Sequence, residues 1–267
     1  QHSINEIEWK STYEAWRVIC CSQYMKDEVR SHFSLPDDKV EVINNGVKEE
    51  NFSSNPPASF RDNYARPDEQ IVYFIGRLVR EKGVHVLINA AQEVLAHNPN
   101  VKFVISGEGP AQMWLEDQAA SLGIREKVLF TGYAGKKMRN NLYQIADVAA
   151  FPSLYEPFGI VTLEAMVTKT PVVVSDVGGF SEIVKHNSNG LKVYPGDSAS
   201  LAHNLLRVLS DRNLAANLIA NAYQEVKTEY NWKTIAKNTI DVYQEVLQEY
   251  NDISWGAQEV KQKLATI

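Results

Sequence analysis

Residues 71–95, IVYFIGRLVREKGVHVLINAAQEVL, decide the fold. Residues 71–75 form a short, continuous apolar run rich in β-formers, which is typical of a strand buried on both faces of a parallel sheet. A polar loop follows at residues 76–83, and apolar residues then recur at helical spacing from Val84 to Leu95. The pattern therefore predicts one strand–loop–helix unit.

The same unit repeats along the chain. Further strands are predicted at residues 101–105, 128–131, 147–151, 171–175 and 190–193, and helices at 110–122, 138–146, 160–168 and 181–184. This alternation predicts an α/β fold, a doubly wound, Rossmann-like parallel sheet followed by C-terminal helices. Ligands of such sheets bind outside the carboxyl ends of the strands, so the polar loops that follow the strands are expected on one face.

The flanks of this pattern suggest further parts. Residues 1–45 predict helix, strand, helix and strand, which is typical of the last βαβ piece of another domain. Residues 46–69 are poor in aliphatic residues and carry several Pro, Ser and Asn, which predicts a linker. Residues 70–230 form the predicted Rossmann-like domain, and residues 231–267 a helical extension.

The composition excludes some classes of function. The chain has 33 acidic and 27 basic residues, a net charge of -6, which argues against a nucleic-acid-binding protein. Its two cysteines, Cys20 and Cys21, are adjacent, which disfavours a disulfide framework and favours a reducing compartment such as the cytoplasm. The six histidines have no metal-ligand spacing, so no metal site is predicted.

Two cations follow the first strand of the main domain. Lys82 precedes Gly83 and the start of a helix, where free backbone N–H groups and the helix dipole favour an anion. The guanidinium of Arg77 and the ammonium of Lys82 together suit a diphosphate. The alternative is two solvated loop cations.

Two carboxylates flank the start of a later helix. Glu156 comes just before residues 158–160, whose amides can bind a phosphate oxygen at the helix start. Glu164 lies eight positions further on, roughly two helical turns away. A carboxylate accepts hydrogen bonds from the vicinal hydroxyls of a ribose or hexose. The alternative is that Glu156 caps the turn and Glu164 is solvated.

Two weaker signals lie at other strand ends. Residues 107–110, GEGP, do not match the dinucleotide-binding fingerprint, and a tight turn into a helix is the favoured interpretation of them. Tyr133 follows the strand predicted at residues 128–131, where its ring either stacks on a base or packs against the next helix.

Together these segments resemble the C-terminal domain of family-4 retaining glycosyltransferases of the GT-B fold, over about residues 17–250. The matching motifs are Asn45-Gly46-Val47, Gly76-Arg77-Leu78 with Lys82-Gly83, Gly107-Glu108-Gly109-Pro110, Thr131-Gly132-Tyr133, Phe151-Pro152-Ser153, residues 156–164, and Pro171-Val172-Val173-Val174 with Gly178-Gly179 and Glu182. The paired glutamates downstream of the two cations are the most specific part of this combination.

The resemblance implies a role for each candidate. Arg77 and Lys82 would hold the donor diphosphate and assist departure of the leaving group, and Glu156 would contact the transferred sugar as the catalytic or positioning glutamate. Glu164 would bind the ribose hydroxyls. The remaining donor-site residues implied are Phe158, Gly159, Ile160 and Val161, whose amides would cradle the phosphate, and Tyr133, which would lie near the base through its backbone.

The resemblance also implies an activity: transfer of a hexose, with retention, from a nucleotide-diphosphate sugar such as UDP-, ADP- or GDP-hexose to a carbohydrate or other hydroxyl acceptor. No metal or cofactor is implied. Residues 1–45 would be the remnant of the acceptor domain, and residues 231–267 would pack back toward that domain. Because only its last segment is recognisable, we expect the chain alone to transfer nothing, and any peripheral membrane association to depend on the missing part.

Three other functions fit the same motifs. A sugar phosphorylase and a nucleotide-sugar epimerase share this architecture, and a non-catalytic module could bind the sugar nucleotide without turnover. Phosphate acceptance, turnover without an acceptor, and binding without turnover would distinguish them from a glycosyltransferase.

Overall fold

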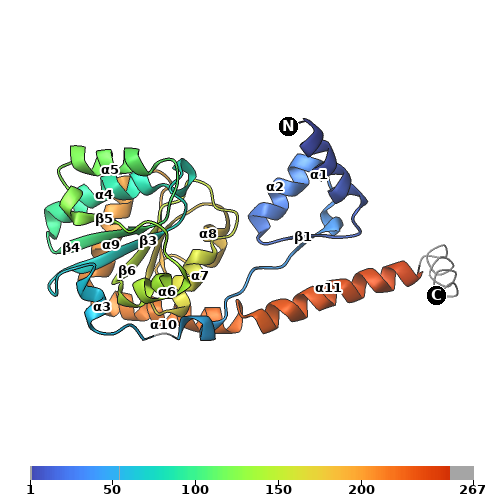
Figure 1. Ribbon diagram of the computed structural model, residues 1–267. Coiled ribbons are helices and arrows are strands. Elements are labelled where there is room, and N and C mark those ends of the chain that lie inside the picture. The colour runs from blue at the N-terminus through green and yellow to red at the C-terminus, as the bar shows by residue number, and fades with distance from the viewer. Residues whose placement is uncertain (1, 54, 253–267) are drawn as a thin grey trace. The chain divides into compact units, whose positions relative to one another are not determined.

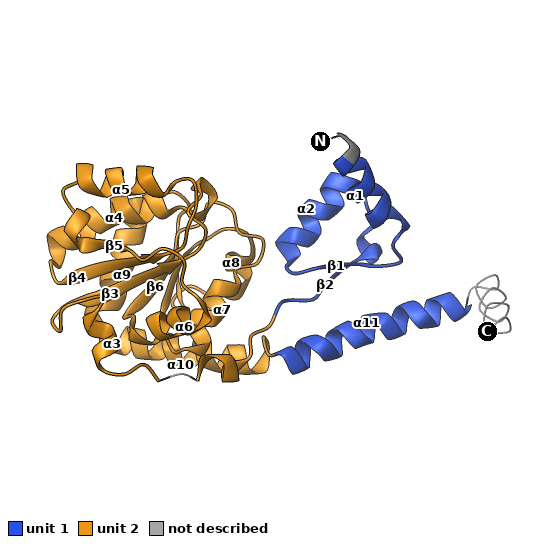
Figure 2. Cartoon of the chain, viewed as in Figure 1, with its two compact units in different colours: residues 1–45, 232–267 blue, residues 46–231 orange. Residues whose placement is uncertain are grey.

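The computed structural model describes residues 2–53 and 55–252 (Figure 1). The chain divides into two compact units (Figure 2). The larger unit comprises residues 46–231, and the smaller combines residues up to 45 with residues from 232 onward. The boundary near residue 45 coincides with the change of pattern in the sequence.

A six-stranded parallel sheet forms the centre of the larger unit. Its strands, in the spatial order β5-β4-β3-β6-β7-β8, are β5 (Val128–Phe130), β4 (Val101–Ser106), β3 (Gln70–Ile75), β6 (Val148–Phe151), β7 (Val172–Ser175) and β8 (Leu191–Val193). Every residue of β6 and β7 is buried. Continuous apolar strands of this kind need a cover on both faces, and the helices supply it.

Helices lie on both sides of the sheet, some against its strands and some against other helices (Figure 1). They are α3 (Ser59–Asp62), α4 (Val84–His97), α5 (Gln112–Ser121), α6 (Lys136–Ile145), α7 (Ile160–Val167), α8 (Gly178–Ile183), α9 (Ser198–Ser210) and α10 (Arg212–Thr228). The α/β, doubly wound prediction is confirmed. Asp197 caps α9 as expected, since its side chain accepts a hydrogen bond from the amide of Ser200 at 3.0 Å.

Three helix starts differ from the prediction, and the first is that of α6, which begins at Lys136, two residues before the predicted start at Met138. The helix α5 begins at Gln112 and not at Pro110, because the amide of Ala111 donates to the Leu78 carbonyl at 3.0 Å and holds this stretch in a turn. The helix α8 begins at Gly178, three residues before the predicted start, so the predicted glycine turn is its first turn.

Residues 46–69 differ from the linker that we predicted, because they belong to the larger unit. Side chains of α6 satisfy backbone carbonyls of this segment: Asn140 donates to Asn51, and Gln144 donates to Phe52 at 2.6 Å. The Phe52 ring is itself buried. A segment poor in aliphatic residues therefore docks through hydrogen bonds to its main chain, through ion pairs such as Glu69 with Lys127, and through a few buried side chains.

The smaller unit contains the parallel pair β1 (Val18–Cys20) and β2 (Val40–Val42) with α1 (His2–Glu14), α2 (Gln23–Phe33) and α11 (Trp232–Asp252). Its buried core is Cys20, Leu35 and Val40. Glu249 of α11 accepts a hydrogen bond from the Trp16 indole at 2.7 Å and forms an ion pair with Arg17. Residues 253–267 of the predicted helical extension lie outside the described residues.

Across the part of the chain that the structure describes, none of the helices is both long and apolar enough to traverse a bilayer.

Candidate functional site

The order of the strands in the sheet indicates which two loops are expected to bind a ligand. The connection through α4 leads from β3 to β4 on one side, and the connection through α7 leads from β6 to β7 on the other. The chain therefore winds in opposite directions from the β3–β6 boundary, and ligands of open α/β sheets bind in the crevice at such a switch point. The loops at the carboxyl ends of these two strands are residues 76–83 and 152–159.

Backbone contacts hold these two loops together. Gly83 has a φ of +66°, and a Cβ added there would lie 1.8 Å from the Pro152 carbonyl oxygen. The amide of Leu154 donates to the Glu81 carbonyl at 2.7 Å. A residue with a side chain at position 83 would push the loops apart, so glycine is required for this approach.

The approach brings Lys82 and Glu156 into direct contact. The Lys82 Nζ lies 2.7 Å from Glu156 Oε2, and the Ser153 hydroxyl lies 3.2 Å from the same oxygen. The Glu156 residue is only 7% exposed, whereas the Lys82 side chain keeps 22% of its surface accessible. A buried carboxylate thus lies beside a cation that still faces solvent.

The N-terminus of α7 begins beside this pair. Gly159 precedes the helix with a φ of +97°, and a Cβ there would meet the Phe180 ring at 2.3 Å. The amides of Ile160 and Val161 belong to the first helical turn, which has no acceptor within its own helix. Phe158 is buried, so of this group its amide and not its ring is suited to a ligand.

Glu164 is buried and paired, so the solvated alternative is wrong. Its Oε1 lies 2.8 Å from an Arg139 nitrogen, and the Tyr143 hydroxyl lies 3.3 Å from its Oε2. The Arg139 guanidinium in turn lies over the Phe52 ring, 5.4 Å from its centroid. Burial raises the pKa of Glu164, and the charge of Arg139 and the hydrogen bond from Tyr143 offset part of that rise.

Sequence reasoning missed Arg139 and Tyr143. They lie four residues apart on α6 and so share one face of that helix. Their spacing marks a helix face, but it gives no sign that this face meets Glu164 of another helix. Only the packing of α6 against its neighbours brings the three side chains together.

The other two predicted residues lie at the rim. The Arg77 side chain is exposed and forms no hydrogen bond or ion pair with another described residue. Tyr133 follows β5 and is 74% exposed. Because β5 is two strands from β3 in the sheet, this position lies roughly 10 Å along the carboxyl edge.

The glycine turn after β4 connects these positions. A Cβ on Gly107 would lie 1.8 Å from the Gly76 carbonyl oxygen, and one on Gly109 would lie 2.3 Å from that of Leu78. The Gly107 amide also donates to the Gly132 carbonyl at 2.8 Å. The tight turn predicted at residues 107–110 therefore holds three adjacent loops in one continuous rim.

Two family models match the chain. The model of "Glycosyl transferases group 1" matches residues 57–225, and that of "Glycosyltransferase Family 4" matches residues 1–51. An uncharacterized glycosyltransferase of Methanocaldococcus jannaschii is 44% identical over 246 residues, which are 90% of this chain and 63% of the relative. A glycogen synthase of Mycobacterium tuberculosis is 34% identical over 240 residues, 90% of this chain and 56% of the relative. The chain thus spans about three fifths of the length of these relatives.

Solved structures share the architecture. The Anabaena protein HepE in complex with UDP and glucose has a TM-score of 0.80 and 27% identity, over 86% of this chain and 63% of that one. Sucrose-phosphate synthase from Thermosynechococcus elongatus has a TM-score of 0.82 and 27% identity, over 93% and 63%. The parallel sheet flanked by helices matches these GT-B glycosyltransferases. Because the group 1 model covers more than half of its residues, the chain belongs to the family of glycosyl transferases group 1.

Proposed function

We propose that this chain is the donor-binding part of a retaining glycosyltransferase, which transfers a hexose from a nucleotide-diphosphate sugar to a carbohydrate or other hydroxyl acceptor. The observation that carries the proposal is the pair of Lys82 and Glu156, 2.7 Å apart at the switch point of the sheet. A cation suited to a phosphate and a carboxylate suited to sugar hydroxyls are adjacent there, as a sugar diphosphate requires.

The diphosphate is assigned to the cationic side of the crevice. Part of the Lys82 side chain is accessible to solvent, and the first-turn amides of Ile160 and Val161 favour an anion. Arg77 has no partner among the described residues that would compete with a phosphate. As the nucleoside diphosphate leaves, negative charge develops on its oxygen, and fixed positive groups stabilise that charge without reorganising.

The hexose is assigned to Glu156. Its carboxylate is held by the Lys82 ammonium and the Ser153 hydroxyl, both on Oε2. The other oxygen, Oε1, is left to accept hydrogen bonds from sugar hydroxyls. In this arrangement Glu156 orients the sugar while Lys82 bridges the sugar-binding carboxylate and the leaving group.

The ribose is assigned to Glu164, with Arg139 as a positioning residue. Burial alone would favour the protonated acid, which donates a hydrogen bond and accepts less well. The guanidinium of Arg139, 2.8 Å away, favours the carboxylate form that accepts from two vicinal hydroxyls. Tyr143 holds the second oxygen from the same helix.

The base is assigned to the rim near Tyr133. A nucleotide sugar is a long ligand, and a base two strands from β3 would lie near the backbone of this residue. The Anabaena relative of known structure holds UDP, so UDP-glucose is the first donor to test.

A thermal-shift panel on this chain tests the proposal. UDP-, ADP- and GDP-glucose are compared with the matching nucleosides and with free glucose. One donor is expected to raise the melting temperature, since a ligand at 100 times its Kd stabilises the folded state by about 2.7 kcal/mol. The nucleoside alone should have a much smaller effect, because it lacks the diphosphate.

A chain that no nucleotide sugar stabilises at millimolar concentration would contradict the proposal. Retention is tested separately on the longer enzyme to which we assign this chain, by NMR of the anomeric proton of the first product formed in the presence of an acceptor. An inverted anomer would overturn the retaining mechanism and leave the donor site in place.

A further inference from the structure

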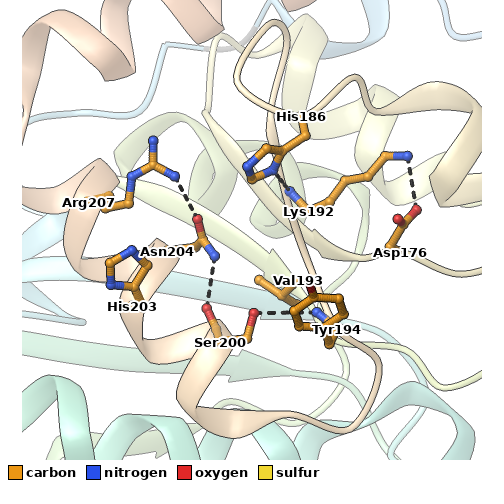
Figure 3. A pocket seen from close by; sticks show the side chains of 9 residues that line it. All are labelled: Asp176, His186, Lys192, Val193, Tyr194, Ser200, His203, Asn204 and Arg207. Carbon is orange, nitrogen blue, oxygen red and sulfur yellow. Dashed lines mark hydrogen bonds and ion pairs between the residues drawn. The ribbon is translucent and has the colours of Figure 1, made fainter.

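A second cavity lies outside the crevice of the proposed donor site (Figure 3). It has a volume of about 430 Å³ and is formed by the end of β7, the strand β8 and the helix α9. Its lining residues are Asp176, His186, Lys192, Val193, Tyr194, Ser200, His203, Asn204 and Arg207. None of them belongs to the proposed donor site, and four of them carry cationic or titratable nitrogen groups.

The charge of Arg207 is held in place but not neutralised. One nitrogen of its guanidinium donates to Asn204 Oδ1 at 3.0 Å, and the other donates to Asn187 Oδ1 at 2.9 Å. Both partners are neutral amides, and no carboxylate of the described residues forms an ion pair with this arginine. Lys192 differs, since its ammonium lies 2.9 Å from Asp176 Oδ1. Arg207 is therefore the uncompensated cation of the cavity.

His186 adds a donor of fixed orientation. Its Nδ1 accepts a hydrogen bond from the backbone amide of Lys192 at 2.9 Å, so the proton of the neutral ring is on Nε2. Burial lowers the pKa of His186, and the charges of Arg207 and Lys192 lower it further. Asp176 opposes this effect. The surroundings of His186 therefore disfavour its protonated, positively charged form.

Two hydroxyl-bearing residues complete the lining. Ser200 Oγ accepts from the Tyr194 amide at 3.4 Å, which leaves its own proton free for a ligand. The Tyr194 ring is 74% exposed, and Figure 3 shows it on the side of the cavity opposite Arg207. The cavity therefore offers Arg207 and His186 on one side, and the Tyr194 ring with the neighbouring Ser200 hydroxyl on the other.

We propose that this cavity binds the phosphate monoester of a small polar molecule, with the phosphate on Arg207 and His186 Nε2 and the organic group near the Ser200 hydroxyl. A phosphate monoester accepts many hydrogen bonds, and its negative charge can pair with an arginine that has no carboxylate partner. The volume of the cavity lies within the range of small-molecule sites, and it leaves room for an organic group beside the phosphate. The Tyr194 ring is available to cover that group.

NMR of the histidine rings tests the proposal on the full chain. Inorganic phosphate and glucose 6-phosphate are titrated at constant ionic strength, with sodium chloride as the reference. Saturable shifts are expected for His186 and His203, together with an upward shift of the pKa of His186. Glucose 6-phosphate should bind more tightly than phosphate, because its sugar contacts the aromatic side.

Arg207→Gln is expected to raise the Kd for glucose 6-phosphate about tenfold or more, as the loss of a charged hydrogen-bond donor does. Arg212→Gln is the matched control, since it removes the same charge from an exposed position on α10. His186→Ala removes the other assigned nitrogen donor from an exposed position, so it should weaken binding severalfold and serves, with His203 as the NMR reporter, if Arg207→Gln lowers the melting temperature. Lys82→Ala should leave all these shifts unchanged, which separates the cavity from the donor site.

Three results would overturn the proposal. Equal shifts with chloride would mean a general salt effect, and phosphate binding without tighter binding of the ester would mean an adventitious ion only. Equal affinities of the Arg207→Gln and Arg212→Gln variants would mean that Arg207 does not bind the phosphate.

Discussion

Glu156 and Glu164 lie eight residues apart in one segment, yet their surroundings differ in kind. The partner cation of Glu156 comes from a loop, and part of its surface faces solvent. The partners of Glu164 both come from one helix, and one of them, Arg139, packs against the Phe52 ring. One carboxylate lies where two loops meet and can exchange its partner with a ligand, whereas the other is built into helix packing. We expect perturbations at Glu156 to affect binding, and perturbations at Glu164 to affect stability as well.

The largest effect on stability is expected at Gly159, which lies between Glu156 and Glu164 in the chain. Gly159→Ala should destabilise the fold by about 2 to 4 kcal/mol, because its Cβ would meet the Phe180 ring at 2.3 Å and its φ is +97°. Urea denaturation measures this change. Gly135→Ala is the control: nothing lies within 4 Å of its Cβ position, and its stability should change by less than about 1 kcal/mol. Equal destabilisation of the two variants would contradict the packing described for Gly159.

Arg139→Gln tests the environment of Glu164. The variant leaves a buried carboxylate without its cation, and we expect a loss of about 2 to 3 kcal/mol in the free energy of unfolding, below the usual range for fully buried pairs because Arg139 is 25% exposed. The double variant with Glu164→Gln should recover part of this loss, because no charge is then left unpaired. Strictly additive losses would mean that the two side chains are not coupled.

Lys82→Ala tests the environment of Glu156. The Kd for the nucleotide sugar that stabilises the chain should rise about 10- to 100-fold, since a charge-assisted hydrogen bond to phosphate is lost. Isothermal titration calorimetry measures the change. Arg80→Ala removes an exposed cation from the same helical turn and should alter the Kd less than threefold. Unchanged affinity of the Lys82 variant would remove this lysine from the proposed site.

The smallest effect is a pH dependence that belongs to Glu164. Its pKa in the folded state is raised, so the folded protein binds more protons than the unfolded chain at pH values above about 4.3. The contribution of Glu164 to stability is therefore greatest at low pH. It falls as the pH rises from about 4.3 through the raised pKa of the folded state. Melting curves of the chain and of Glu164→Gln between pH 4 and pH 7 should show that the wild-type chain loses stability relative to the variant as the pH rises. The opposite trend would mean that its ion pair outweighs its burial.

Much of the fold could be predicted because hydrophobic periodicity is a local signal. The strand predicted at residues 71–75 and the helix from Val84 were confirmed, as was the convergence of Lys82 with Glu156. The strand order that selects their two loops depends on pairing between distant segments, which periodicity does not report.

Other features were hidden for related reasons. Residues 46–69 dock through hydrogen bonds to their main chain and through ion pairs with distant segments, which composition does not report, so their composition suggested a linker. The contact of Arg139 with Glu164 depends on how two helices pack, and the contact of Arg207 with Asn187 joins α9 to a loop outside it. Each is a tertiary arrangement of side chains that single segments do not encode. The roles of the donor-site residues, the absence of a metal and the cytoplasmic location stay predictions.

The glycine contacts along the rim have a consequence for how the chain can vary in length. At Gly83, Gly107 and Gly109, one main chain touches the next with no space for even a methyl group. These loops have no room for an inserted residue, so an insertion would displace the neighbouring loops of the rim. Gly123 and Gly135 face open space, so natural insertions and engineered tags are expected to be tolerated there.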